Sequence, residues 1–307
     1  CGLIGYIGKK NAKGIILKGL KRLEYRGYDS AGLAVFDNDK KLHITKRKGN
    51  VSKLVDKIAN NGIDGNIAIG HTRWATHGVP NNINAHPHID YSKKFILACN
   101  GIIENYKTIK KLLEKNKIFS KTDTYTEVLV NLIGYLYSIN DVSFEEAVRL
   151  ALNEIVGAYG ILVMSNEEPD KIIAARFGSP IILGIKGKQK FIASDIAPIM
   201  PYTNNLVYLD EGEMVVMDHN QFIVKDIAKN LKINKNIEKI EFDLNEIEKG
   251  NYKHFMLKEI FEQNNTARQA IRGRINLENR SIILGGIDDY TDKILAAKQI
   301  YITGCGT

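Results

Sequence analysis

Cysteine is scarce in this chain. Only Cys1, Cys99 and Cys305 occur among 307 residues, and no two of them are spaced as a CxxC pair. Three widely separated cysteines exclude a disulfide framework and argue against a zinc site built on cysteine. Such usage is typical of proteins in a reducing compartment, so we expect a cytoplasmic location.

Long apolar runs are also absent. No stretch approaches the roughly 18 apolar residues of a membrane-spanning helix. The first residues do not combine a basic segment with an apolar one, as a secretory signal does. We therefore expect neither secretion nor a membrane partner.

Dense basic runs are missing as well, although the formal net charge is +8. The lysines are scattered among asparagines and isoleucines, without interleaved aromatic residues. Because nucleic-acid binding needs a concentrated phosphate-contacting surface, we expect no nucleic-acid partner. The positive charge instead indicates a lysine-rich, solvated surface.

What the chain does have is a cysteine at its first position. A terminal cysteine carries a thiol and a free α-amine, whose unperturbed pKa values are about 8.5 and about 8. The amine can accept the thiol proton, so one residue supplies both nucleophile and base. The glycine-broken apolar run from Leu3 to Ile7 predicts a buried strand that would anchor this terminus. The alternative is that Cys1 merely marks where the numbering begins.

Hydrophobic periodicity divides the chain into strands, then helices, then further strands. Strands are predicted at 3–7, 31–36, 42–47, 66–70 and 95–99, and several short ones between 159 and 217. Helices are predicted at 12–23, 51–59, 104–116, 126–138 and 144–156. This order favours a layered α+β sandwich over a regular βαβ alternation.

The composition changes after about residue 240. The segment from Glu238 to Gly250 is acidic and polar, 255–275 has a helical pattern, and 300–307 resembles a strand running into a glycine turn. In complete α/β domains, such a turn leads to a helix N-terminus suited to phosphate. The prediction is a first domain over 1–240, a linker over 241–250 and the beginning of a second domain over 251–307.

Arg73 is the strongest candidate for substrate binding, and it precedes Trp74, Thr76 and His77. Arginine binds a carboxylate through two parallel hydrogen bonds, which suits an amino-acid substrate. The alternative is a surface arginine beside a core tryptophan.

Four histidines, His71, His77, His86 and His88, fall within a short segment and invite a metal-binding interpretation. None of them has the i,i+4 helical spacing of a metal site, and no HExxH motif or cysteine companion occurs. We therefore expect no metal and no other cofactor.

The dipeptide Asn100-Gly101 follows a predicted strand. Its side-chain amide and backbone N–H could form the two donors of an oxyanion hole. Asn-Gly is also the commonest tight-turn dipeptide, so a plain turn is the alternative.

Several of these segments together resemble the class II glutamine amidotransferases, an N-terminal-nucleophile hydrolase family. The resemblance rests on CGLIGYIG at 1–8, LEYRGYDSAGLAV at 23–35, HTRWATHGVPNNINAHPH at 71–88 and NGIIENY at 100–106. HFMLKEIFEQ at 254–263 and ITGCGT at 302–307 look like the start of a sugar-isomerising half. Within the family, the chain is most similar to members that aminate fructose 6-phosphate.

The resemblance implies a four-layer αββα sandwich, followed by a truncated α/β sugar-isomerase domain. It also implies that Cys1 attacks the glutamine side-chain amide with its own α-amine as base. Asn100 and the N–H of Gly101 would hold the oxyanion. Arg26 would order the pocket near the nucleophile, and His86 would support it.

The family also implies how glutamine is bound. Arg73, with Thr76 and His77, would bind the α-carboxylate end. Trp74 would lie in a mobile loop that closes over the site and guides ammonia onward.

One position departs from the family pattern, which has an aspartate that binds the α-ammonium of glutamine. Counting without gaps from Asn100-Gly101 places Tyr125 at that position and leaves Asp123 two residues early. Tyrosine pairs less strongly with an ammonium than a carboxylate does. We expect Asp123 to bind the ammonium, the alternative being reduced glutamine affinity. Cys99 stands where the family has histidine, and we interpret it as strand packing.

The implied reaction is hydrolysis of glutamine to glutamate and ammonia. In an intact enzyme, ammonia would convert fructose 6-phosphate to glucosamine 6-phosphate in amino-sugar biosynthesis, and the intact enzyme would be a homodimer. We expect the present chain to hydrolyse glutamine without making the sugar. The alternatives are the same module serving another acceptor, as in amidophosphoribosyltransferase, and a non-catalytic module that senses glutamine. A papain-like protease is disfavoured, because its cysteine is internal.

Overall fold

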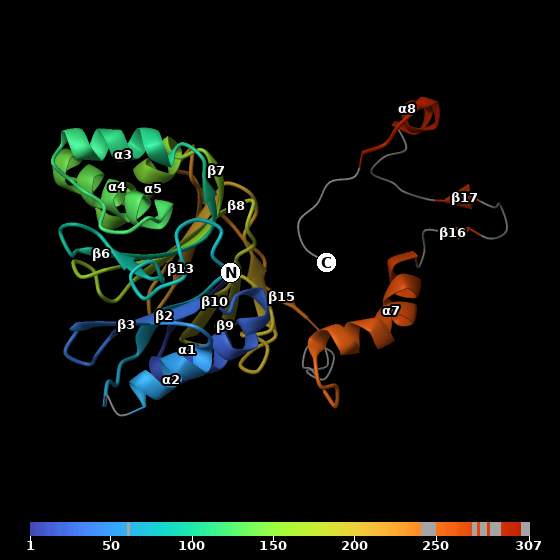
Figure 1. Ribbon diagram of the computed structural model, residues 1–307, viewed down its shortest axis with the longest axis horizontal. Helices are drawn as coiled ribbons and strands as arrows, with labels where there is room; N and C mark the ends of the chain where they lie inside the picture. Colours follow the sequence, from blue (N-terminus) through green and yellow to red (C-terminus); the bar gives the residue numbers. More distant parts are fainter. Residues whose placement is uncertain (60–61, 241–249, 272–274, 277–280, 283–289, 302–307) are drawn as a thin grey trace. The chain divides into compact units, whose positions relative to one another are not determined.

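The computed structural model describes residues 1–59, 62–240, 250–271, 275–276, 281–282 and 290–301 (Figure 1). The chain divides into two compact units, Cys1–Leu244 and Asn245–Thr307. The predicted linker 241–250 lies, except for Gly250, outside the described residues. The predicted domain boundaries therefore stay a prediction.

The described part of the first unit contains two antiparallel sheets. One sheet has the strand order β15-β11-β9-β10-β1-β4-β2-β3, and the other has the order β14-β13-β12-β8-β7-β6-β5. The strands of the former are β1 (Gly2–Ile7), β2 (Ser30–Phe36), β3 (Leu42–Lys48), β4 (Ile67–Arg73), β9 (Ile182–Lys186), β10 (Gln189–Ala193), β11 (Asn205–Tyr208) and β15 (Glu238–Lys239). Those of the latter are β5 (His88–Ile89), β6 (Phe95–Ile103), β7 (Gly157–Ser165), β8 (Ile172–Phe177), β12 (Glu213–Met217), β13 (Phe222–Asp226) and β14 (Lys232–Ile233).

Helices cover the outer face of each sheet (Figure 1). On the β1 sheet lie α1 (Ala12–Arg22) and α2 (Val51–Ile58). The short helix η1 (Glu24–Arg26) follows α1 in the chain, and β3 precedes α2. On the β6 sheet lie α3 (Tyr106–Lys115), α4 (Tyr125–Asn140) and α5 (Phe144–Glu154). Separate apolar clusters fill the helix–sheet spaces and the space between the sheets. The predicted four-layer αββα sandwich is confirmed.

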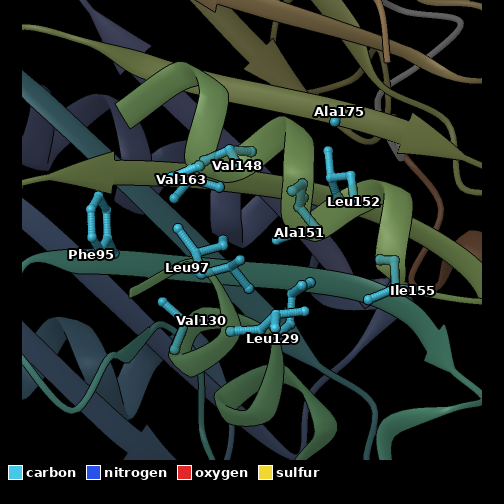
Figure 2. Packing of buried hydrophobic residues seen from close by; sticks show 14 of the residues in the cluster. Phe95, Leu97, Leu129, Val130, Val148, Ala151, Leu152, Ile155, Val163 and Ala175 are labelled. Carbon is cyan, nitrogen blue, oxygen red and sulfur yellow. The ribbon is translucent and has the colours of Figure 1, made fainter. Parts of the chain in front are cut away.

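The packing of α4 and α5 on the β6 sheet illustrates how the sequence pattern produces a layer. Figure 2 shows Leu129 of α4 and Val148 and Leu152 of α5 in one buried cluster with Leu97 of β6 and Val163 of β7. These five side chains are at most 3% exposed. The apolar residues of α5 recur at helical spacing, so a single stripe of the helix is buried.

The starts of these two helices are fixed by side-chain caps. The hydroxyl of Ser143 accepts the N–H of Glu146 at 3.3 Å, and Thr124 accepts the N–H of Glu127 at 3.4 Å. Both pairs have the Ser/Thr-x-x-Glu spacing of a capping box. Thr124 therefore sets where α4 begins and where Tyr125, the first residue of that helix, is placed.

The face of β4 that lies between the sheets changes from apolar to polar along the strand. Alternate residues of a strand share a face. Ile67 and Ile69 belong to the apolar cluster between the sheets, whereas His71 and Arg73 continue the same face as polar residues. All four side chains are buried.

The neighbouring strands change in the same way. On β6, Ile96 and Ala98 belong to the apolar cluster and Asn100 is the next residue on their face. On β1, Leu3 lies in the cluster opposite His71 of β4, and Cys1 precedes it by two residues. Polar residues from three strands are thereby gathered at one end of the space between the sheets.

The N-terminal strand is held firmly at that end. The N–H of Leu3 donates to the hydroxyl of Ser194 at 3.0 Å, and the N–H of Ser194 donates to the Leu3 carbonyl at 3.0 Å. At Gly2, a Cβ would lie 2.6 Å from Cβ of Leu23 and 2.7 Å from the hydroxyl oxygen of Thr72. A larger residue would displace the strand, so Gly2 permits the close packing that positions Cys1.

Two strands extend further than the sequence predicts. β4 continues to Arg73, and β6 continues through Asn100-Gly101 to Ile103. The alternative of a tight turn at Asn100-Gly101 is wrong, because Asn100 lies opposite Gly160 and Gly101 opposite Tyr159 in the pairing with β7. Long-range pairing with β7 outweighs the local turn preference of Asn-Gly.

The second unit contains α7 (Phe255–Ile271), the paired strands β16 (Ile275–Asn276) and β17 (Ser281–Ile282), and α8 (Thr291–Ala296). Of the predicted helix over 255–275, α7 confirms Phe255–Ile271, whereas Ile275 lies in β16 and 272–274 lie outside the described residues. The predicted terminal strand over 300–307 lies, from residue 302 onward, outside the described residues, as does Cys305. Among the described helices, none is long and apolar enough to cross a membrane.

Candidate active site

Cys1 lies against the segment that follows β4. Its α-amine donates to the carbonyl of Arg26 at 2.5 Å. Its Sγ accepts the backbone N–H of Trp74 at 3.2 Å and lies 3.5 Å from the Trp74 carbonyl, to which the thiol donates. Both reactive groups of Cys1 are thus oriented by the backbone of other segments.

The α-amine of Cys1 lies near the charges of Arg26 and Asp29. Its pKa is lowered from 8.0 to about 6, mainly by burial and in addition by the nearby Arg26 charge, while Asp29 opposes the shift. The proton-free form therefore predominates above about pH 6. A free amine beside a thiol in one residue can take the thiol proton directly or through one water.

Asn100 directs its side chain at the same residue. Its Nδ2 donates to the Cys1 carbonyl at 3.2 Å, and its Oδ1 lies 3.1 Å from Nε2 of His71. Because Oδ1 is an acceptor, His71 must donate from Nε2. Burial lowers the pKa of the His71 ring to about 3, with the charge of the N-terminal amine as a further cause, so the ring is neutral. The predicted pair Asn100 and Cys1 is brought together, with His71 behind it.

Gly101 adopts φ +117°, in the region that favours glycine. A Cβ at this position would lie 2.0 Å from the carbonyl oxygen of Ala158. The hydroxyl of Tyr125 donates to the Gly101 carbonyl. The backbone next to Asn100 is thereby fixed from both sides.

Arg73 folds back over the loop that follows it. Its Nη2 donates to the carbonyls of His77 and Gly78, the latter at 3.3 Å. In the described part of the chain, its Nη1 is buried without a hydrogen-bond partner. A buried guanidinium with an unused donor is well suited to receive a carboxylate.

The other predicted substrate-binding residues surround this loop. The ring of Trp74 is half exposed and meets Tyr28 edge-on, with centroids 5.6 Å apart. The ring of His77 lies 5.3 Å from Tyr106 and 6.1 Å from Tyr125. The loop is therefore bordered by aromatic rings.

Tyr125 is directed at the same loop. Burial raises the pKa of its hydroxyl, and interactions with the Thr76 side chain and the Arg73 charge partly offset the rise. Thr76, Arg73 and Tyr125 are thus neighbours.

Asp123 lies at the edge of the same region. Its carboxylate accepts from Nδ2 of Asn84 at 3.0 Å, and its backbone N–H donates to Oδ1 of Asn84 at 3.2 Å. A Cβ at Gly78 would lie 2.9 Å from Cβ of Asp123, so the loop of Arg73 packs against it. Asp123 remains exposed, and its charge raises the pKa of Arg73 against the larger lowering by burial.

Arg26 is tied to Asp195. Its Nη2 lies 2.5 Å from Oδ2 of Asp195, and the hydroxyl of Tyr25 donates to the same oxygen at 2.6 Å. This contact fixes the short helix η1, whose Arg26 carbonyl receives the Cys1 amine.

His86 belongs to a buried row of rings. Its centroid lies 4.3 Å from that of His71 and 5.0 Å from that of His88. Nδ1 of His86 accepts the N–H of Cys99 at 3.4 Å, and Nε2 of His88 lies 3.0 Å from the Thr124 hydroxyl. Burial lowers the pKa of His86 and His88 well below the usual value, so the row is neutral. Among the described residues, no group of three or more His, Cys, Asp or Glu side chains is arranged to hold a metal ion.

Three residues with direct contacts to this site, His71, Tyr28 and Asp29, have no role in it that the sequence predicts. The sequence suggests His71 only as a metal ligand, and it leaves open whether Asp123 or Tyr125 contacts the ammonium. The carboxylate of Asp29 accepts the N–H of Ala75 at 2.8 Å. The position of His71 two residues before Arg73 on a strand was the one available signal, because it places both on one face.

Taken together, the arrangement suits attack by a thiolate on a carbonyl carbon. The thiol and an amine of lowered pKa are both on Cys1, and Asn100 presents an amide donor beside them. Preorganised donors of this kind stabilise a developing oxyanion. Arg73 offers a site for an anionic group of the substrate.

Comparison of the sequence with known families gives a match to the glutamine amidotransferase domain over residues 43–253. The chain is 47% identical over 307 residues to glutamine–fructose-6-phosphate aminotransferase (isomerizing) of Bacteroides thetaiotaomicron. It is 48% identical over 312 residues to the protein of the same name of Chlorobaculum tepidum. Each match covers 100% of this chain and 50% of the relative, so the chain spans about half the length of the curated relatives it matches.

Solved structures with a similar fold include the glutamine phosphoribosylpyrophosphate amidotransferase of B. subtilis complexed with ADP and GMP. The TM-score is 0.64 at 26% sequence identity, over 75% of this chain and 50% of that chain. A structure described as the allosteric regulatory enzyme of purine biosynthesis gives a TM-score of 0.65 at 25% identity, over the same shares of the two chains.

Proposed function

Since the chain belongs to the glutamine amidotransferase family and has its N-terminal-nucleophile fold, we propose that it hydrolyses the side-chain amide of glutamine at Cys1. The observation that carries this proposal is the placement of Cys1: its Sγ accepts the backbone N–H of Trp74, and Nδ2 of Asn100 donates to its carbonyl. The lowered pKa of its α-amine, about 6, agrees with this placement. An amine with this pKa is available as a base at neutral pH, where an ordinary α-amine is mostly protonated.

The proposed reaction has two halves. In the first, the amine takes the thiol proton and Sγ attacks the amide carbon, while Nδ2 of Asn100 and the N–H of Gly101 stabilise the oxyanion. The proton then passes to the leaving nitrogen, which departs as ammonia and leaves a γ-glutamyl thioester on Cys1. In the second half, water, deprotonated by the same amine, attacks the thioester and releases glutamate and the free thiol.

The α-carboxylate of glutamine would be received by Arg73, because its buried Nη1 lacks a partner among the described atoms. Thr76 and His77 flank this position on the loop, and Trp74 would cover the bound substrate. Asp123 is proposed to receive the α-ammonium, since it packs beside Gly78 in the same loop. Tyr125 is the competing candidate, because its hydroxyl is directed at Gly101.

Two further residues are proposed to support the nucleophile. Arg26 would hold the amine through its carbonyl and lower its pKa through its charge. His86 would support His71 and the backbone of Cys99 without contacting the substrate.

For the whole protein, we propose that ammonia released here aminates fructose 6-phosphate to give glucosamine 6-phosphate. The support is the name shared by the relatives that match the full length of this chain. Residues 251–307 would begin the sugar-isomerase domain, with 241–250 as the linker. A cytoplasmic location and a homodimer of the whole protein remain predictions.

The test measures glutamate, ammonia and glucosamine 6-phosphate after incubation with glutamine and fructose 6-phosphate. The 307-residue chain should release glutamate and ammonia in equal amounts and form no amino sugar, whereas the full-length protein should form both glutamate and amino sugar. If the full-length protein aminated phosphoribosyl pyrophosphate instead, fructose 6-phosphate would be the wrong acceptor. Glutamine binding without glutamate release by either form would contradict the hydrolase and favour a glutamine sensor.

A further inference from the structure

A second cavity lies beside the active-site loop, and the proposed hydrolysis does not use it. It has a volume of about 570 Å³ and opens between the end of β3, the start of α2 and the segment around Pro80. Volumes of this size are common for small-molecule sites. The cavity belongs entirely to the first unit of the chain.

The lining of this cavity is predominantly cationic. Arg47, Lys48 and Lys53 contribute three positive charges, and Asp29 contributes one carboxylate. Within the described part of the chain, none of the three cations forms an ion pair with an acidic side chain, whereas other lysines and arginines do, such as Lys40 with Asp170 and Arg176 with Glu211. Three cations without acidic partners around one cavity favour an anionic ligand.

The side chain of Lys53 lies beside Gly49. Gly49 adopts φ +97°, and a Cβ at that position would lie 2.9 Å from Cδ and 3.2 Å from Nζ of Lys53. The positive φ favours glycine at position 49, and its missing side chain leaves room for the flexible end of Lys53.

The remaining polar groups suit hydroxyls better than a second anion. Asn82 uses its Oδ1 to accept the N–H of Lys48 at 2.7 Å, so its amide hydrogens remain as donors. Asp29 uses Oδ2 for the N–H of Ala75, so its second oxygen remains as an acceptor. Together with the phenol of Tyr28, these groups offer both donors and acceptors to a hydroxylated ligand.

The walls of the cavity are also held in place by the backbone. The N–H of Gly49 donates to the carbonyl of Asp29 at 2.7 Å, and the Lys48–Asn82 bond joins β3 to the loop of Pro80. A frame of this kind orders the binding groups before the ligand arrives, which lowers the entropy lost on binding.

We propose that this cavity binds a sugar phosphate at a site separate from Cys1. The phosphate would lie among Arg47, Lys48 and Lys53, and the sugar hydroxyls would face Asp29, Tyr28 and Asn82. The inference goes beyond glutamine hydrolysis, because none of the three cations contacts the nucleophile.

The site is coupled to the loop that covers Cys1. Tyr28 lines the cavity and meets the ring of Trp74 edge-on, and Asp29 holds the backbone of Ala75. Trp74 is the single tryptophan of the chain. A ligand that moves Tyr28 or Asp29 will therefore change the tryptophan fluorescence of the protein.

The experiment combines equilibrium dialysis with tryptophan fluorescence on the 307-residue chain, with fructose 6-phosphate as the probe. Inorganic phosphate, fructose and sodium chloride at matched ionic strength serve as comparison probes. Fructose 6-phosphate should bind saturably and change the fluorescence, phosphate should bind more weakly, and fructose should not bind. If fructose 6-phosphate, phosphate and sodium chloride at one ionic strength changed the fluorescence equally, the change would reflect general screening of charges by salt. That result would overturn the proposal.

The variants are Lys53→Gln and Arg47→Gln, with Lys57→Gln as the matched control. Lys57 lies one turn further along α2 and does not line the cavity. Each lining variant should weaken binding of fructose 6-phosphate by about tenfold, because it removes a charged hydrogen bond to phosphate. The control should bind as the parent does.

Binding that is unchanged in both lining variants, or absent in the parent, would overturn this site. Glutamate release by the same samples separates this result from the proposed function. A parent chain that hydrolyses glutamine but does not bind the sugar phosphate loses only the second site. A chain that binds the sugar phosphate but releases no glutamate loses only the hydrolase.

Discussion

The space between the two sheets has two ends that are built differently from the same strands. At one end, Ile67 and Ile69 of β4 face Ile96 and Ala98 of β6, and the layer is entirely apolar. At the other end, the next residues on the same faces are polar and buried, and they meet Cys1. The apolar end contributes stability through burial, whereas the polar end holds a few hydrogen-bond donors in fixed directions.

This difference separates two kinds of substitution. A change at the apolar end should lower the free energy of unfolding and leave the chemistry of the folded fraction unaltered. A change at the polar end should alter kcat more than stability, because its groups act on the nucleophile and the oxyanion.

Among substitutions that leave Cys1 in place, the largest effect is expected for Asn100→Ala. Loss of one oxyanion donor should lower kcat for glutamate release by about 10²–10³, with little change in KM. Asn140→Ala, at the exposed end of α4, is the matched control and should retain the parent kcat. A rise in KM with unchanged kcat would instead show that Asn100 acts in substrate binding.

Ile69→Ala tests the apolar end of the same strand that carries His71. Removing this fully buried side chain should lower the free energy of unfolding by about 2–5 kcal/mol. Denaturant titration measures the loss, and steady-state kinetics below the unfolding transition measures activity. A large change in kcat per folded molecule would show that the two ends are not separable.

His71→Ala should lower kcat about tenfold, because the Asn100 amide loses the donor that fixes its orientation. His71→Gln retains a side-chain N–H and should recover part of the loss. A purely structural role would lower stability in both variants without this recovery in kcat. Equal kcat values for Ala and Gln would contradict a positioning role.

The smallest expected effect is that of the Arg26 charge on the pKa of the Cys1 amine, and the pH profile of activity tests it. Since the base must be unprotonated, kcat/KM should fall as pH drops below about 6. Arg26→Gln removes a positive charge that disfavours the protonated amine, so the pKa of the amine should rise and the acidic limb should move to higher pH. Arg149→Gln, whose ion pair with Glu146 lies elsewhere, should leave the limb in place.

Most secondary-structure elements could be predicted because their apolar residues recur at one period. α1, α2, α5, β2 and β3 begin and end within about two residues of the predicted positions. The continuation of β6 through Asn100-Gly101 could not be predicted, because it depends on pairing with β7, which lies about sixty residues later in the chain. A local turn preference says nothing about such a partner.

The candidate site was predictable only in part, for the same reason. The resemblance brought together Cys1, Arg73 and Asn100, and the alternation of β4 supports their common face. The roles of His71 and Asp29 depend on contacts with Asn100 and Ala75, which no periodicity reveals. The choice between Asp123 and Tyr125 for the ammonium still depends on where a bound glutamine would lie, and it stays a prediction.

The most direct test of the account measures glutamate release from glutamine by three forms of the chain. The parent form has a free Cys1, the second carries Cys1→Ala, and the third keeps Cys1 but has one residue added before it, which removes the base. We expect release by the parent and none by either variant, with all three forms folded as judged by circular dichroism. Release that survives Cys1→Ala or the added residue would contradict a nucleophile and base housed together at position 1.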